Sequence, residues 1–176
     1  MVIYLSVMQD TNGFNPINSS TVIEQFVEGV LQKYRASYLF RSSFDYRNQI
    51  DYLAAIAQRM CENDEFMAEY SILYDWTKEY FDGIGQEHDY TKLIDHFIQN
   101  KIFAYEGNNV YFRYNIFLSY FIAHQMLNSK SFRDWILTPP RYMTYINEVD
   151  IYCGLSRNDV ESLARSIHES TVVFDV

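Results

Sequence analysis

Apolar residues recur at helical spacing along most of this 176-residue chain, and this periodicity restricts the fold more than any other feature. One stripe runs through Val22, Ile23, Phe26 and Val27. Ser19, Ser20 or Thr21 can cap this helix at its start, and Glu24 is placed for a capping box. Similar stripes predict further helices at about 46–61, 71–81 and 115–127, and short helical pieces at 131–137 and 141–147. We therefore expect a mainly α protein.

The helical periodicity is interrupted once, between residues 101 and 114. Residues 101–105 and 110–114 alternate apolar and polar side chains on either side of a turn that contains Gly107 and Asn108. Two short alternating runs around such a turn predict a β-hairpin. A helix that Asp89 or Thr91 can cap precedes this hairpin. Helix, helix, hairpin, helix is the order of a winged-helix-like unit, with 71–81 and 91–99 as its first two helices and the hairpin as its wing.

These patterns divide the chain into three expected segments. Residues 1–70 form a helical arm, 71–128 the winged-helix-like unit with one small β-hairpin, and 129–176 a C-terminal helical segment. At the ends, residues 2–8 fit a short helix or strand, Ser156 can cap a final helix, and 171–174 favour a strand.

The charge balance disfavours two classes of partner. The chain has 23 acidic and 14 basic residues, a net charge of -9. Such a chain repels the phosphates of nucleic acids and anionic membrane surfaces, because affinity for both depends on cations. The second helix of the winged-helix-like unit balances Lys92 with Asp95, so we do not expect DNA binding. The apolar start is too short for a signal peptide and no stretch has the length of a membrane span, so we expect a cytoplasmic protein.

Motifs for catalysis and metal binding are absent from the sequence. The six glycines do not form a phosphate-binding loop, and no Gly-x-Ser-x-Gly elbow occurs. Cys61 and Cys153 stand alone, and no His pair has the spacing of zinc ligands. A pair of Cys153 with His168 depends on the fold, although a structural thiol is the simpler interpretation. We expect no catalytic residue, no metal site, no cofactor bound by this chain, and no enzyme activity.

Residues 110–123, with the sequence VYFRYNIFLSYFIA, resemble a known pattern. The segment is similar to the winged-helix region of STAND-class NTPases, the NACHT-like switch ATPases, whose pattern reads Phe-x-His-x-x-Phe-x-Glu-Tyr/Phe-Phe-Ala-Ala. Five positions match this pattern: Phe112, Phe117, Tyr120, Phe121 and Ala123. The two polar positions of the pattern depart from it: Tyr114 stands where the family has the His that senses a nucleotide phosphate, and Ser119 where it has Glu.

The resemblance implies a regulatory module of a switch protein used in signalling or antiphage defence. The nucleotide-binding domain, with its ATP or ADP, would precede Met1, and a sensor or repeat region would follow Val176. Tyr114 would be the contact to a nucleotide phosphate through its hydroxyl, which cannot carry the charge of a protonated histidine. Arg113 and Tyr120 would contact a protein partner, either the nucleotide-binding domain or a signalling protein.

Three alternatives stay open at this point. Tyr114 and Tyr120 fit equally well as hairpin or core residues of an ordinary fold. The chain also fits a stand-alone helical adaptor or inhibitor, which would have a closed core with no orphan apolar face. A DNA-binding winged helix is a third alternative, which the acidic charge opposes.

Overall fold

The computed structural model describes residues 19–33 and 44–156. This part of the chain holds eight helices and a small antiparallel sheet of three strands, which confirms the expected mainly α fold with a small β-hairpin. The predictions for residues 2–8, for a helix after Ser156 and for a strand at 171–174 lie outside the described residues.

The long helices lie where the apolar stripes predict them. They are α2 (Ser19–Lys33), α3 (Tyr46–Glu62), α4 (Tyr70–Gly83), α5 (Tyr90–Gln99) and α6 (Asn115–Asn128). Asp45 caps α3, because its carboxylate accepts a hydrogen bond from the backbone N–H of Asn48 at 3.0 Å. Of the two residues predicted to cap α5, Asp89 does so, accepting from the N–H of Lys92 at 3.1 Å.

The sheet contains one strand that the sequence patterns did not predict. The hairpin strands β2 (Phe103–Glu106) and β3 (Asn109–Phe112) are joined by β1 (Met67–Glu69), and the strand order is β1-β3-β2. Ala68 of β1 lies opposite Val110 of β3, and both are buried. A strand of three residues is too short to show a period, and Met, Ala and Glu favour helices. Only the pairing with β3 makes this segment a strand.

The last third of the described chain differs from its prediction. Helix α7 (Lys130–Ile136) agrees with the predicted piece, but the single piece at 141–147 is wrong. Instead α8 (Arg141–Thr144) ends early and α9 (Ile146–Leu155) follows it. The sequence patterns missed helix α9 because apolar residues lie on all sides of this helix and do not form a single stripe. Ser156, which we expected to begin a helix, is the C-terminal cap of α9.

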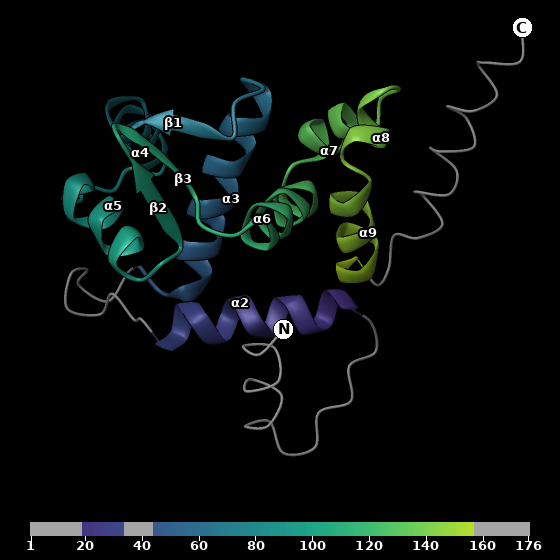
Figure 1. Cartoon of the computed structure of the whole chain (residues 1–176), viewed down its shortest axis with the longest axis horizontal. Helices are drawn as coiled ribbons and strands as arrows, with labels where there is room; N and C mark the ends of the chain where they lie inside the picture. Colours follow the sequence, from purple (N-terminus) through teal and green to yellow (C-terminus); the bar gives the residue numbers. More distant parts are fainter. Residues whose placement is uncertain (1–18, 34–43, 157–176) are drawn as a thin grey trace, which may run out of the picture.

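The described helices share one continuous core. Figure 1 shows the sheet with α4 and α5 at one end of the molecule and α7 to α9 at the other, with α3 and α6 between them. Helix α2 crosses beneath, from α3 to α9. The buried side chains form a single cluster that runs from Ile23 in α2 to Tyr152 in α9. The predicted boundaries at residues 70 and 128 stay a prediction.

An aromatic stack holds α3 against α4 and α5. The ring of Tyr52 lies 5.7 Å from that of Phe81 and 5.6 Å from that of Phe97, measured between centroids. The hydroxyl of Tyr52 is hydrogen-bonded to that of Thr77 at 2.8 Å, and the Thr77 hydroxyl donates to the carbonyl of Leu73 at 2.6 Å. These contacts hold α3 beside α4.

Candidate functional site

The junction between β3 and α6 places the first two predicted site residues together. Tyr114 is the N-terminal cap residue of α6, and its carbonyl accepts a hydrogen bond from the N–H of Phe117 at 3.0 Å. Its ring is 44% exposed and lies edge-on to the buried ring of Phe117, with centroids 5.5 Å apart. The backbone at Tyr114 is therefore fixed while the residue stays exposed to solvent.

Arg113 lies beside Tyr114 and adds a positive charge. Its Nε donates to the Tyr114 hydroxyl at 3.4 Å, and its guanidinium carbon lies 5.6 Å from the centre of the Tyr114 ring. Within the described part of the chain, Arg113 forms no ion pair with a carboxylate. The pair therefore presents exposed hydrogen-bond donors that suit a phosphate or a carboxylate.

Tyr120 lies apart from this pair, in the core. Its side chain is 1% exposed, and its ring lies 5.4 Å from that of Phe121 and 5.9 Å from that of His124, between centroids. Burial, and then the carboxylates of Glu24 and Glu28, raise the pKa of its phenol, so it stays neutral. In this conformation the ring does not reach a partner.

Position 119, which departs from the family pattern, is next to a carboxylate from another element. The hydroxyl of Ser119 on α6 donates to Oε1 of Glu148 on α9 at 2.6 Å. The structure thus has a glutamate beside this position, although it comes from a different helix. No sequence pattern relates residues 119 and 148, because they meet only when α9 packs on α6.

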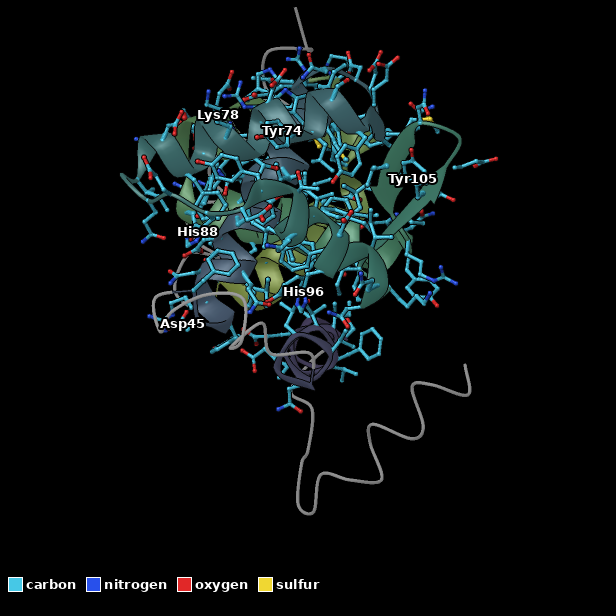
Figure 2. The ribbon with its side chains drawn as sticks, turned by 90° about the vertical axis from the view of Figure 1, so that its left-hand side faces the viewer. Asp45, Tyr74, Lys78, His88, His96 and Tyr105 are labelled. Atoms are coloured by element: carbon cyan, nitrogen blue, oxygen red, sulfur yellow. The ribbon has the colours of Figure 1, made fainter. Side chains whose placement is uncertain are left out.

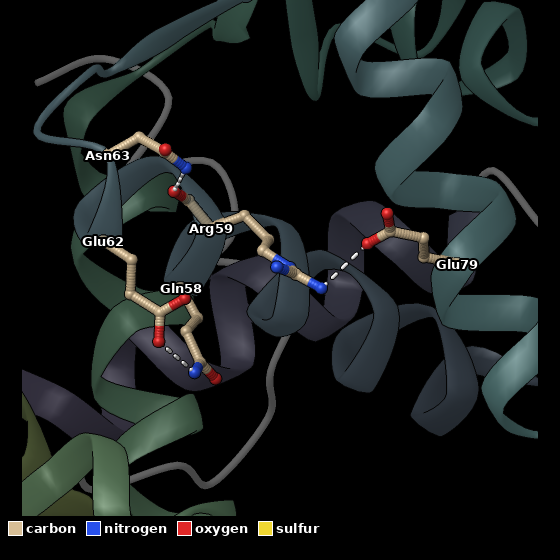
Figure 3. Close-up of polar contacts among 5 residues, drawn as sticks. All are labelled: Gln58, Arg59, Glu62, Asn63 and Glu79. Atoms are coloured by element: carbon tan, nitrogen blue, oxygen red, sulfur yellow. Dashed lines mark hydrogen bonds and ion pairs between the residues drawn. The ribbon is translucent and has the colours of Figure 1, made fainter.

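A second feature, the α3–α4 groove, was not predicted from the sequence. It has a volume of about 380 Å³ and opens to solvent between the two helices. Its polar and aromatic lining comes from Gln58, Arg59, Glu62, Trp76, Glu79 and Tyr80. Figure 3 shows the ion pair that spans it, from Nη2 of Arg59 to Oε2 of Glu79 at 2.9 Å. Both side chains are about half exposed.

The groove residues of α3 are held by amide contacts. Gln58 donates to Oε1 of Glu62 at 2.6 Å, as Figure 3 shows, and accepts from Gln125 of α6 at 2.5 Å. Burial, with the nearby Asp51, raises the pKa of Tyr80 to about 12, so the groove holds a neutral phenol. The only sequence signal was that each of the two helices has polar residues three or four positions apart, which places them on one face of that helix. This spacing does not show that the two faces meet.

The cysteines are free thiols in protected places. Cys61 is fully buried and Cys153 is partly buried. Burial raises the pKa of the Cys61 thiol to about 12 and also raises that of Cys153. The suggested pairing of Cys153 with His168 involves a residue outside the described part of the chain. Within residues 19–33 and 44–156, no group of three or more His, Cys, Asp or Glu side chains has the arrangement of a metal site.

The segment that contains the sheet, α4, α5 and the Arg113–Tyr114 pair matches a known family. A family model described as Novel STAND NTPase 4 matches residues 66–122. The STAND match covers roughly a third of the 176 residues and supports a relation to the STAND class. It begins just before β1 and ends within α6. No curated protein and no solved structure matches the chain.

None of the helices in residues 19–33 and 44–156 is both long enough and apolar enough to cross a bilayer.

Proposed function

We propose that this chain is a non-catalytic regulatory module of a STAND-class switch protein, built around a winged-helix unit. The observation that supports the proposal best is the order of elements in and beside the STAND-matched segment. Helix α3 is followed by β1, α4, α5 and the hairpin β2–β3, and the strands pair in the order β1-β3-β2. Three helices on a three-stranded sheet with a hairpin wing are the parts of a winged helix.

In this proposal the first helix of the unit is α3 rather than α4. The sequence patterns assigned residues 71–81 to the first helix because β1 was not expected. With β1 present, α3 precedes the first strand, and α4 and α5 take the second and third positions. The contact between Tyr52 and Thr77 attaches α3 to α4, which supports including α3 in the unit.

The Arg113–Tyr114 pair is the proposed contact with the nucleotide-binding domain. Tyr114 takes the position of the family's phosphate-sensing histidine, and its exposed hydroxyl can donate a hydrogen bond. Arg113 supplies the positive charge that Tyr114 lacks, 5.6 Å from the same ring. Together they suit the phosphate of ATP or ADP held by a domain of the parent protein, or a carboxylate on that domain.

The module would act through an interface with two states and not through chemistry. A nucleotide that binds one state more tightly shifts the equilibrium between closed and released arrangements. We propose a cytoplasmic role of this kind in signalling or antiphage defence, with the nucleotide-binding domain or a signalling protein as the partner.

The charges on the face of α4, α5 and the hairpin disfavour DNA as the partner. Figure 2 shows this face, with Lys78 on α4, His96 on α5 and Tyr105 on the hairpin. On α5, the helix that would enter a groove, the ammonium of Lys92 is already paired with Asp89 at 2.9 Å. Asp95 on the same helix accepts a hydrogen bond from Tyr70 at 3.3 Å and would oppose a phosphate.

Photocrosslinking in the native polypeptide tests the proposal. p-Benzoylphenylalanine replaces Tyr114, and the matched control replaces Met143, which is 61% exposed on α8 at the other end of the molecule. We expect Tyr114→p-benzoylphenylalanine to crosslink to a nucleotide-binding domain with a P-loop, with a yield that changes about fivefold or more between ADP and a non-hydrolysable ATP analogue.

Two results would contradict the proposal. One is a crosslink yield that does not depend on the nucleotide, or that equals the yield from position 143. The other is a purified chain that stays monomeric in light scattering and binds little hydrophobic dye, together with no crosslink to a nucleotide-binding domain. The second result would favour the stand-alone adaptor or inhibitor.

A further inference from the structure

We propose that the α3–α4 groove binds an arginine side chain that a partner protein presents. This inference is independent of the proposed switch function, because it depends on residues 58–80 of α3 and α4 and not on the Arg113–Tyr114 pair. Its support comes from an indole and a carboxylate that, among the described residues, have no ring partner and no ion pair respectively, and from the groove that both line.

The indole of Trp76 is the first part of the site. The chain has two tryptophans, and they differ in their contacts. Trp135 is stacked on Phe132 and covered by the guanidinium of Arg141, 4.3 Å from its ring centre. In the described part of the chain, Trp76 has neither an aromatic nor a cationic neighbour of this kind, although it is only partly buried and lines the groove. The chain itself thus shows which group covers a partly exposed indole.

The carboxylate of Glu62 is the second part. It is exposed and accepts one hydrogen bond, from Gln58. Within residues 19–33 and 44–156 it forms no ion pair, whereas Glu79 across the groove is paired with Arg59. An incoming guanidinium can therefore pair with Glu62 while its flat face covers the indole of Trp76.

Arg59 shows that the groove accommodates a guanidinium. Its own guanidinium reaches Glu79 from the facing helix across the same space. Exposed ion pairs of this type contribute little to stability, so Arg59 can turn aside or share Glu79 with a second cation.

The chemistry favours arginine over other ligands. The net charge of -9 attracts cations and repels polyanions such as nucleic acids. A guanidinium is planar, stacks on an aromatic face and binds a carboxylate through two N–H groups, whereas an ammonium is a strongly hydrated point charge. A groove of about 380 Å³ accommodates one long side chain with its backbone outside.

Titration of the full isotope-labelled chain with a short peptide tests the site. The probe is acetyl-Gly-Arg-Gly-Arg-Gly-amide, and the control peptide carries the neutral isostere citrulline in place of arginine. We follow the two indole N–H signals by NMR. The signal of Trp76 should shift and saturate with the arginine peptide only, while that of Trp135, already covered by Arg141, should not move.

A matched pair of charge-neutralising variants separates the groove from the overall charge. Glu62→Gln should weaken binding about two- to fivefold. Glu106→Gln removes the same charge from an exposed position on β2, outside the groove, and should leave the affinity unchanged. Both positions are on the surface, so both variants should fold.

The proposal is overturned by any of three results: no saturable shift of the Trp76 signal, equal binding of the citrulline peptide, or equal loss of affinity in the two variants. Equal loss would mean that only the overall charge attracts the peptide. None of these results bears on crosslinking from position 114, so the two proposals fail separately.

Discussion

The buried hydroxyl pair of Tyr52 and Thr77 is a residue-scale contact on which the packing of two helices depends. Thr77 donates to the Leu73 carbonyl, so the Tyr52 hydroxyl donates to Thr77. Both side chains are fully buried. The contact is therefore a directional hydrogen bond inside an otherwise apolar core.

The stability losses from removing the two partners of this pair should not add. Tyr52→Phe should lower the free energy of unfolding by about 1 kcal/mol, and Thr77→Val by about 1–3 kcal/mol because it leaves a buried phenol without a partner. The double variant should cost less than the sum of the two losses. Urea unfolding measures all three, and additive losses would contradict a direct hydrogen bond.

His124 predicts a pH dependence of stability. It is partly buried on α6, and its Nδ1 lies 3.3 Å from the amide nitrogen of Asn128. Burial is the main cause that lowers its pKa. The charge of Asp51 raises the pKa and that of Arg47 lowers it, and both effects are smaller. Below about pH 6.5 the unfolded chain then binds a proton that the folded chain resists, so stability falls on acidification.

His124→Gln should therefore flatten the loss of stability between about pH 7 and pH 5. Burial also lowers the pKa of His88, so His88→Gln should remove a separate share of the slope. Urea unfolding at a series of pH values checks both variants. An unchanged slope in His124→Gln would mean that this side chain titrates as freely in the folded chain as in the unfolded one.

At the scale of elements, the hairpin turn requires a glycine, whereas the helix α2 contains a glycine that its backbone conformation does not require. Gly107 has a φ of 62°, which L side chains rarely adopt, whereas Gly29 lies within α2. A Cβ at either position would meet no atom within 4 Å, so packing does not distinguish them. Only the backbone conformation does.

This difference predicts opposite effects of the same substitution. Gly107→Ala should destabilise the chain by about 1 kcal/mol, because alanine is strained at a positive φ. Gly29→Ala should stabilise it by about 0.5–1 kcal/mol, because alanine loses less conformational freedom in a helix. Thermal or urea unfolding of the two variants compares them, and a shift of the same sign in both would show that the turn does not hold Gly107 as described.

At the scale of the whole molecule, the single core joins the two ends seen in Figure 1. Trp76 on α4 reports on the end that holds the sheet, and Trp135 on α7 reports on the other end. Helix α2, with the fully buried Val27, contacts α3, α6 and α9 and so spans both.

Both ends should unfold in one cooperative transition. In Trp135→Phe, the fluorescence of Trp76 should follow the loss of helix measured by circular dichroism. The same should hold for Trp135 in the variant Trp76→Phe. Leu31→Ala, which truncates a buried side chain near the C-terminal end of α2, should lower stability by about 2–5 kcal/mol in both backgrounds. Separate transitions would instead support the division of the chain at residues 70 and 128.

Local patterns predicted most of the helices because α2 to α5 each carry an apolar stripe and, for α3 and α5, an aspartate cap. The hairpin was predictable for the same reason, since the residues that form it and its turn at Gly107 are adjacent in the sequence. The candidate pair of Arg113 and Tyr114 came instead from the family resemblance of residues 110–123, and its role stays a prediction.

The sequence by itself therefore determined the helices with one apolar face, the hairpin and the acidic surface, which depend on neighbouring residues. Only the tertiary structure decided the features that depend on distant residues. Strand β1 exists because Ala68 pairs with Val110, α9 is stabilised by packing on α6 and α2, and the α3–α4 groove is lined by Glu62 from one helix and Trp76 from the other. The physical reason is the same in each case: the stabilising interaction joins segments that are far apart in the sequence, so no periodic pattern within one segment reveals it.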